Sequence, residues 1–216
     1  MEKSPVRAEN LFASFPQLRA ELEQMKVAHH FRTGGIIFRA GEIPLGLYLV
    51  QEGLCKLEAI SECGAAHTLR LVGPGGALGY RSLFADEPYH ASAIAVENTD
   101  VYFIPKIEVM HLFHKHPEVT LRFLSHLAKD LRAAETKWIH QIDKGAPQRV
   151  AESLLFLSEK FKHANWTRRE IAQWAGTTTE TVIRTLAQFE KEDLVAQAGR
   201  EIKIIDRERL IERAEI

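Results

Sequence analysis

The chain has 216 residues, a formal net charge of −1 and 45% hydrophobic residues, which is ordinary for a globular protein of one large or two small domains. It has no apolar run of about 18 residues, and its N-terminus lacks the apolar segment of a signal peptide, so we expect a cytoplasmic protein with no membrane partner. Two cysteines are too few for a disulfide scaffold or a four-cysteine metal site, and the near-neutral charge excludes a uniformly basic nucleic-acid binder.

The N-terminal half changes from a helical to a β-strand pattern. Apolar residues recur at helical spacing from about residue 10 to residue 25 and predict a short helix. From Ala28 to about Ile104, short β-rich runs are separated by glycine-containing turns, which is typical of a sandwich or a jelly-roll barrel. The runs predict strands at residues 35–38, 47–50, 55–60, 68–72, 91–96 and 101–104.

A long helix is predicted after Pro117, over about Glu118 to Asp143. Residues in it step by three and four positions, as in the seam of a coiled coil. Such a seam could pack against the chain's own barrel, but its length and narrowness favour pairing with a second copy of the chain. Lys144–Pro147 then breaks the helix, and another is predicted over about Gln148 to Phe161. The seam residues are Leu124, Leu127, Leu131, Ala134, Trp138 and Gln141.

Two short helices that meet at a tight turn are predicted between Asn165 and Leu186. Thr167 and Glu170 form a capping box, so the first helix should begin at the residue after Thr167. Gly176 permits the left-handed backbone that the turn needs, and the second helix should begin two or three residues later. The inward face of that second helix is expected to carry Val182, Leu186 and Phe189.

The outward face of the second helix is expected to read DNA. Arg184 can donate two hydrogen bonds to guanine, Glu180 can accept one from cytosine, and Ile183 can contact a thymine methyl group. The alternative is an exposed Glu180–Arg184 pair at i,i+4 spacing, which would be worth only a few tenths of a kcal/mol. Threonines near the start of the helix are placed to bind phosphate, where the helix dipole also favours anions.

A β-hairpin, or wing, is predicted after the second helix. Two short β-rich runs within Leu194–Ile205 flank a turn at Ala198–Arg200. Arg200 at its tip is expected to touch a phosphate, with a solvated turn charge as the alternative. The full set expected to contact DNA is Thr167, Arg168, Arg169, Thr178, Thr179, Glu180, Thr181, Ile183, Arg184 and Arg200.

A β-barrel, a long helix and a winged helix–turn–helix in this order resemble the Crp/Fnr superfamily of bacterial transcription regulators. The resemblance covers nearly the whole chain and is strongest at Thr167–Ala172, at Gly176 and at Thr178–Arg184. It implies an α+β protein with a cyclic-nucleotide-binding-like sensory barrel in residues 1–116, a dimerisation helix and hinge in 117–145, and a DNA-binding domain in 146–216. It also implies a homodimer on a palindromic double-stranded DNA operator, with RNA polymerase as a further partner.

The family's base-reading Glu-x-x-x-Arg pair falls on Glu180 and Arg184. In the cyclic-AMP-type regulators an arginine precedes the glutamate, whereas this chain has Thr179 there, so we expect a different operator.

The family's effector cassette falls on residues 75–84 and the segment that follows. Cyclic-AMP binders carry a glutamate where this chain has Tyr80, and an Arg-Ser pair where it has His90-Ala91. Without that arginine, a charge-assisted contact to the cyclic phosphate worth about 1.5–3 kcal/mol is missing, so we do not expect cyclic AMP to bind. The candidate effector contacts are Leu78, Gly79, Tyr80, Arg81, Ser82, His90, Ala91, Ala134 and Glu135.

Histidines and cysteines are the remaining candidates for chemistry. His111 and His114 could share one helical face, but no carboxylate at a matching spacing completes a metal site, so we assign no metal ligand and no catalytic residue. Cys55 and Cys63 are expected on a strand and its adjoining turn, as ordinary thiols rather than a redox switch.

Three functions therefore stay open. The first is a dimeric regulator controlled by an unidentified small effector, with a variant that acts without any effector. The second is a cupin-like metal enzyme with an accessory DNA-binding domain. The third is a barrel that serves only for dimerisation or docking. The residues do not name an effector or a cofactor.

Overall fold

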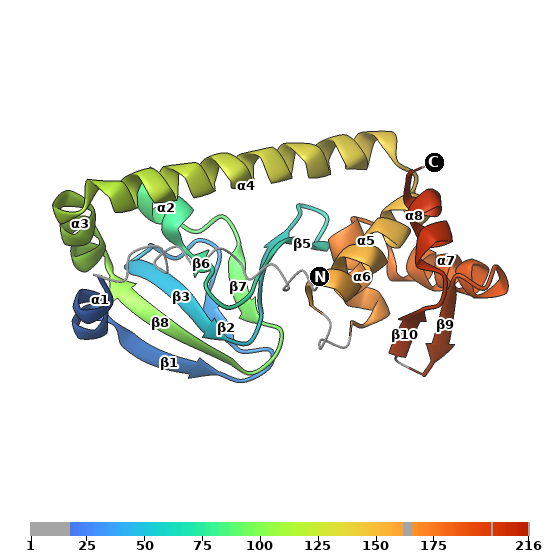
Figure 1. Cartoon of the computed structure of the whole chain (residues 1–216), viewed down its shortest axis with the longest axis horizontal. Helices are drawn as coiled ribbons and strands as arrows, with labels where there is room; N and C mark the ends of the chain where they lie inside the picture. The colour runs from blue at the N-terminus through green and yellow to red at the C-terminus, as the bar shows by residue number, and fades with distance from the viewer. Residues whose placement is uncertain (1–17, 162–165, 200, 216) are drawn as a thin grey trace, which may run out of the picture. The chain divides into compact units, whose positions relative to one another are not determined.

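The computed structural model describes residues 18–161, 166–199 and 201–215. These form two compact units, one ending at Arg132 and the other beginning at Ala133 (Figure 1). The boundary falls within one continuous helix, α4 (Pro117–Asp143), so each unit contains part of it.

The first unit contains two four-stranded antiparallel sheets, which confirms the predicted β-roll. The strand order is β1-β8-β3-β6 in one sheet and β2-β7-β4-β5 in the other. The sequence pattern did not single out β1, whose side chains are mostly exposed, or β6, which has only two residues. The strands are β1 (Val27–Phe31), β2 (Ile36–Phe38), β3 (Gly46–Glu52), β4 (Cys55–Ile60), β5 (Ala66–Val72), β6 (Ala77–Leu78), β7 (Ser92–Ala95) and β8 (Thr99–Pro105).

Three short helices accompany these strands: α1 (Arg19–Met25), α2 (Tyr80–Ala85) and α3 (Lys106–Lys115). The helix predicted from residue 10 is described only from α1 onward, and residues 10–17 lie outside the described part of the chain. One core cluster joins β3 to α2, α3 and the start of α4, and includes Leu47, Tyr80, Val119 and Phe123. A second fills the space between the sheets, around Phe38, Val50 and Leu57.

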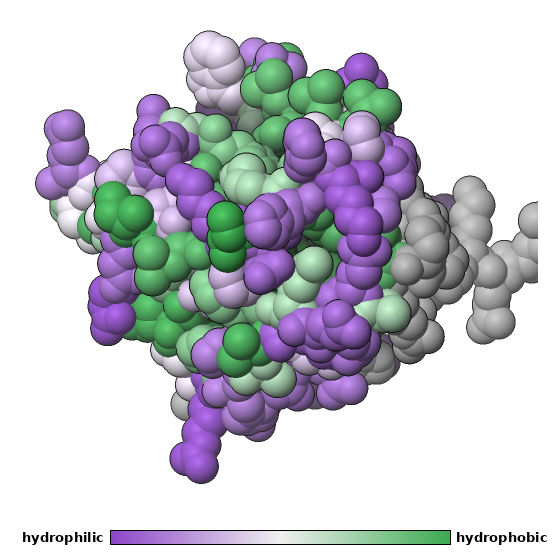
Figure 2. All heavy atoms as spheres, turned by 90° about the vertical axis from the view of Figure 1, so that its left-hand side faces the viewer, coloured by the Kyte–Doolittle hydropathy of each residue, from purple (hydrophilic) through white to green (hydrophobic). Residues whose placement is uncertain are grey.

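The face of the first unit that carries α1 and α3 has hydrophobic and hydrophilic side chains interspersed (Figure 2). Ile107 and Met110 of α3 are among the exposed hydrophobic residues of this unit. Isolated apolar side chains of this kind are normal on a protein surface.

The exposed apolar row of the long helix α4 shares Leu124, Leu131 and Trp138 with the predicted seam but differs at other positions. Leu127 packs against the core of the first unit, and Gln141 donates a hydrogen bond to the carbonyl oxygen of Ala175, so neither belongs to an open seam. The residues two turns apart in the predicted row, Leu124, Leu131 and Trp138, are 61%, 61% and 68% exposed. The exposed row at alternating spacings of three and four is Leu121, Leu124, Ala128, Leu131, Glu135, Trp138 and Ile142.

The second unit continues from α4 into a helical domain with a two-stranded sheet (Figure 1). Its elements are α5 (Ala146–Lys160), α6 (Arg168–Ala175), α7 (Thr179–Lys191), β9 (Val195–Ala198), β10 (Glu201–Ile204) and α8 (Arg207–Glu215). The predicted winged helix–turn–helix is therefore confirmed, and α8 is an addition that the sequence pattern did not reveal. The core contains Val150, Leu157, Ile171, Val182, Leu186, Phe189 and Leu210, each at most 2% exposed.

Candidate DNA interface and effector cavity

The helix–turn–helix is built by two caps and one glycine. The backbone N–H of Glu170 donates to the Thr167 hydroxyl at 3.2 Å, and the Thr167 N–H donates to the Glu170 carboxylate at 2.8 Å. Gly176 ends α6 with φ of +63°, in the left-handed region that favours glycine. Thr178 then caps α7, since its hydroxyl accepts from the N–H of Thr181 at 3.1 Å. The short-range pattern alone was sufficient to predict the capping box, the left-handed Gly176 and the start of α7, but not the Thr178 cap.

Helix α7 has one buried and one exposed face, as predicted. Val182 and Leu186 are fully buried, whereas Glu180 and Arg184 are exposed and Ile183 is 55% exposed. Within the described residues, no ion pair joins Glu180 to Arg184. The charged groups of both side chains are therefore accessible to another molecule.

Two arginines predicted to contact DNA, Arg168 and Arg169, lie at the start of α6 in different environments. Arg169 is exposed, but the guanidinium of Arg168 donates to the Gln197 side chain of β9 at 2.8 Å. Gln197 in turn donates from its backbone and side-chain nitrogens to the carboxylate of Glu190, at 2.9 and 3.1 Å. Arg168 therefore helps to tie the wing to α6, and Gln197 ties it to α7, roles that the sequence pattern did not predict. Arg200 lies outside the described residues.

A basic groove of about 620 Å³ runs beside α7. It is lined by residues from the start of α5, from α7 and from α8. Arg184 shares this groove with Lys191 and Arg213, and Arg213 also forms an ion pair with Glu192 at 3.0 Å. Lys191, the last residue of α7, and Arg213 of α8 were not predicted as site residues, because both lie outside the Asn165–Leu186 motif.

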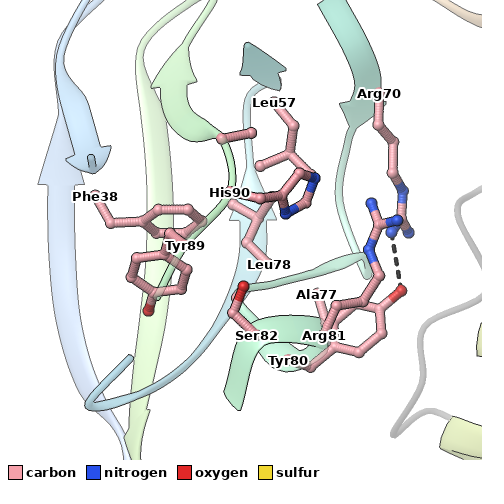
Figure 3. Close-up of a pocket in the computed structure, with 12 residues that line it drawn as sticks. Phe38, Leu57, Arg70, Ala77, Leu78, Tyr80, Arg81, Ser82, Tyr89 and His90 are labelled. Carbon is pink, nitrogen blue, oxygen red and sulfur yellow. Dashed lines mark hydrogen bonds between the residues drawn. The ribbon is translucent and has the colours of Figure 1, made fainter. Parts of the chain in front are cut away.

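The segment predicted as an effector cassette lines a small cavity of about 20 Å³ in the first unit (Figure 3). Seven of the predicted effector contacts meet there: Leu78, Gly79, Tyr80, Arg81, Ser82, His90 and Ala91. Ala134 and Glu135 are exposed residues of α4 that belong to the other unit.

A polar network closes one side of the cavity, and Figure 3 shows its bond between Arg70 and Tyr80. The Arg70 guanidinium donates to the Tyr80 hydroxyl at 2.9 Å and to the Asp130 carboxylate at 2.6 Å. The Tyr80 hydroxyl also donates to Asp130, and His126 lies 3.0 Å from Arg70 through its Nε2 atom. Burial raises the pKa of Tyr80 to about 12, so it stays a neutral donor at physiological pH. The network joins β5 and α2 to α4.

The other side of the cavity is aromatic. Phe38 and Tyr89 stack with their ring centres 3.8 Å apart, and His90 points toward the cavity beside Leu57 (Figure 3). Burial, together with the nearby charge of Arg81, lowers the pKa of His90. A cavity of about 20 Å³ suits a group of about water size, because a single water needs roughly 10–15 Å³ measured in this way.

The cysteines and the histidines in the described part of the chain form no metal cluster. Across the described ranges, no three side chains of His, Cys, Asp or Glu are grouped to hold a metal ion, and His111 and His114 are exposed on α3. Cys55 is buried in β4, which raises the pKa of its thiol to about 12. Cys63 is exposed in the β4–β5 turn, and a hydrogen bond from Ser61 lowers the pKa of its thiol. Among the helices described, none is long and apolar enough to cross a bilayer.

Comparison with known proteins matches both units to described domain families. Residues 28–116 match the cyclic nucleotide-binding domain, and residues 148–213 match the Crp-like helix-turn-helix domain. The chain is 34% identical over 164 residues to the cyclic AMP receptor protein of Thermus thermophilus, covering 75% of this chain and 76% of that protein. It is 31% identical over 205 residues to the transcriptional regulator SdrP of the same species, covering 90% of this chain and 97% of that one.

A solved structure agrees with these relatives. The crystal structure of a CRP/FNR-family transcriptional regulator from Thermus thermophilus is similar with a TM-score of 0.76 and 28% identity, over 88% of this chain and 99% of that one.

Proposed function

The chain belongs to the Crp/Fnr family of DNA-binding transcription regulators, and we propose that it binds a two-fold operator as a homodimer through the exposed face of α7. Its relatives are transcription regulators and not enzymes, and we assign it no catalytic residue. One observation carries the proposal. Helix α7 buries one apolar face, and on its outward face Glu180 and Arg184 do not form an ion pair with each other.

The chemistry of that outward face supports base reading. Arg184 can bind the O6 and N7 atoms of guanine with two donors, and Glu180 can accept from the amino group of cytosine. Ile183 is an apolar side chain in an otherwise polar row, which suits a thymine methyl group better than it suits water. Thr178, which caps α7, has its hydroxyl near the positive end of the helix dipole, where a phosphate is favoured.

The exposed row on α4 supports the homodimer. It alternates spacings of three and four, as in a two-stranded coiled coil, and only Glu135 interrupts its apolar character. A second copy of the same helix would bury the exposed leucines and Trp138 symmetrically. Two recognition helices related by such an axis fit half-sites about one helical turn of DNA apart. RNA polymerase is the partner that the family resemblance implies for a regulator bound at a promoter.

The cavity does not fit a cyclic nucleotide, so we propose DNA binding without one. Small-molecule pockets usually enclose about 300–1,000 Å³, whereas this cavity has about 20 Å³. Arg70 and Tyr80 fill the cavity's edge and satisfy each other and Asp130, so opening the site would break a part-buried network. This geometry favours the variant of the function in which no effector is needed.

Selection of bound DNA from a random pool tests the proposal. We expect the full-length protein to enrich a palindrome with or without added cyclic AMP, and Arg184→Ala to lose about 1–3 kcal/mol of specific binding and to relax preference at a guanine. Arg207→Ala is the matched control, because Arg207 is an exposed arginine of the same unit that pairs with Glu159.

Three results would count against the proposal. Unchanged selection by Arg184→Ala would remove its reading role. Enrichment that appears only with cyclic AMP would contradict the nucleotide-free mode. Stoichiometric bound metal that is lost in His111→Ala would favour the metal-enzyme alternative instead.

A further inference from the structure

The turn of the helix–turn–helix is held by two side chains from outside the motif. Gln141, in the last turn of α4, donates from Nε2 to the carbonyl oxygen of Ala175 at 3.2 Å. Arg149, in the first turns of α5, donates from Nε to the same oxygen at 3.0 Å and from Nη2 to the carbonyl oxygen of Gly176 at 3.3 Å. Both acceptors belong to the point where α6 ends and the chain turns toward α7.

These bonds have a clear electrostatic reason. The last carbonyl groups of a helix have no partner within it and carry the negative end of the helix dipole. A guanidinium is a charged, planar donor that can serve several acceptors in one plane. Arg149 uses its third nitrogen, Nη1, to donate at 2.5 Å to the carbonyl oxygen of Lys144, in the connection between α4 and α5. One side chain therefore joins this connection directly to the recognition turn.

One turn earlier, α4 also packs against α5 and α6 through aromatic side chains. The ammonium group of Lys137 lies 3.9 Å from the centre of a Trp174 ring, and Trp174 stacks on Phe156 of α5 with ring centres 5.0 Å apart. His140 of α4 also pairs with Glu152 of α5 at 2.7 Å. Several noncovalent contacts therefore hold the last turns of α4 against α5 and α6.

We propose that Gln141 and Arg149 are positioning residues for DNA binding, which lock the turn before the recognition helix to the end of the dimerisation helix. The inference rests on the proposed homodimer and two-fold operator. In such a dimer the paired α4 helices define the two-fold axis. Gln141 and Arg149 fix the position of α7 relative to that axis without touching DNA. Their contribution is therefore to the distance and angle between the two recognition helices.

This role predicts an effect on half-site spacing. One added base pair moves the half-sites apart by about 3.4 Å and rotates one of them around the DNA, so a rigid pair of recognition helices cannot match both. A loosened turn lets each α7 adjust separately. The cost of a wrong spacer should then fall, while contacts within each half-site stay the same.

Operators with spacers changed by one or two base pairs test the proposal on the full-length protein. For the wild type we expect about tenfold weaker binding to an operator lengthened by one base pair, similar to the cost of a mismatched position. Gln141→Ala and Arg149→Lys should reduce that penalty at least threefold, with unchanged affinity for non-specific DNA. Lysine keeps the charge but lacks the fork that joins the turn to Lys144. Arg207→Ala should behave as the wild type.

The outcomes separate the two levels of the proposal. A wild type that ignores spacer length overturns the two-fold operator and the positioning role together. A discriminating wild type with equally discriminating variants overturns only the positioning role. The positioning role is also overturned if the variants weaken every operator by one common factor with a lower melting temperature, since that is the behaviour of a merely structural contact. If Arg149→Lys does not fold, Gln141→Ala decides, because it removes a single donor.

Discussion

Substitution of Gly176 by alanine should destabilise the second unit through two separable effects. The φ of +63° at this position is unfavourable for a residue with a Cβ atom. A Cβ atom there would also lie 2.8 Å from Oε1 and 2.9 Å from Nε2 of Gln141. The Gln141 side chain must then move, because these distances are shorter than any ordinary contact, and it would lose its hydrogen bond to Ala175.

The magnitudes follow from these two effects. A left-handed backbone costs a non-glycine residue roughly 1–2 kcal/mol. Displacing the end of a flexible side chain costs little by itself, but the lost hydrogen bond is worth about 1 kcal/mol. We therefore expect Gly176→Ala to lower the free energy of unfolding by about 2–3 kcal/mol in the wild type. In a Gln141→Ala background only the backbone cost of roughly 1–2 kcal/mol should remain.

Urea unfolding of the wild type, both single variants and the double variant measures this coupling, with tryptophan fluorescence as the signal. Gly199→Ala is the matched control, because Gly199 has φ of +60° and no heavy atom within 4 Å of the added Cβ. It should show the backbone cost alone, whether or not Gln141 is present. Equal losses for Gly176→Ala in the two backgrounds would refute the contact with Gln141 and weaken the inferred positioning role.

Three further variants test the other parts of the molecule. Leu131→Asp should convert the proposed homodimer to a monomer in sedimentation, because it places a charge in the middle of the exposed α4 row, whereas Lys129→Asp, off that row, should not. Lys137→Met should abolish a rise in the free energy of unfolding that the wild type shows from about pH 8 to pH 10.5. Burial lowers the pKa of Lys137 from 10.5 to about 8, so the unfolded chain holds more protons in this window and stability rises with pH. Arg70→Ala should lower the free energy of unfolding by about 2 kcal/mol, less than the roughly 3–5 kcal/mol of a fully buried pair, because Arg70 and Asp130 keep 20% and 17% exposure. Adding Asp130→Asn to the Arg70→Ala variant should restore part of the lost free energy of unfolding.

Each of these has a contrary result. A dimeric Leu131→Asp protein would place the interface elsewhere. The same pH profile in Lys137→Met and the wild type would assign the titration to another group. An Arg70→Ala protein as stable as the wild type would mean that the cavity network does not hold α4 to the first unit.

Local sequence signals were enough for the elements that form through neighbouring residues. The capping box of Thr167 and Glu170, the left-handed Gly176 and the buried spacing of Val182 and Leu186 all act within one or two helical turns. The β-runs were recognised for the same reason, except the exposed strand β1 and the two-residue strand β6, which carry too little pattern.

The α4 row was only half predictable. Its period of seven is present in the sequence, and Leu124, Leu131 and Trp138 of the predicted seam are exposed in the structure. Which neighbours complete the row depends on the side of the helix that packs against the chain itself. Contacts with residues far away in the sequence determine which side of α4 is buried, and the hydrogen bond from Gln141 to Ala175 is one of them.

The sequence by itself determined that this protein is a barrel, a long helix and a winged helix–turn–helix, because each element is specified by the order of nearby residues. Only the tertiary structure decided that the cavity beside the predicted effector cassette has about 20 Å³ and is bordered by a polar network. Arg70, Tyr80 and Asp130 come from three separate elements, and folding brings them within hydrogen-bond distance. It likewise brought Arg149 to the recognition turn, 26 and 27 residues away along the chain. Such hydrogen bonds join residues far apart in the sequence, and forming them costs loop-closure entropy. They follow no local periodicity, so a short sequence pattern cannot predict them.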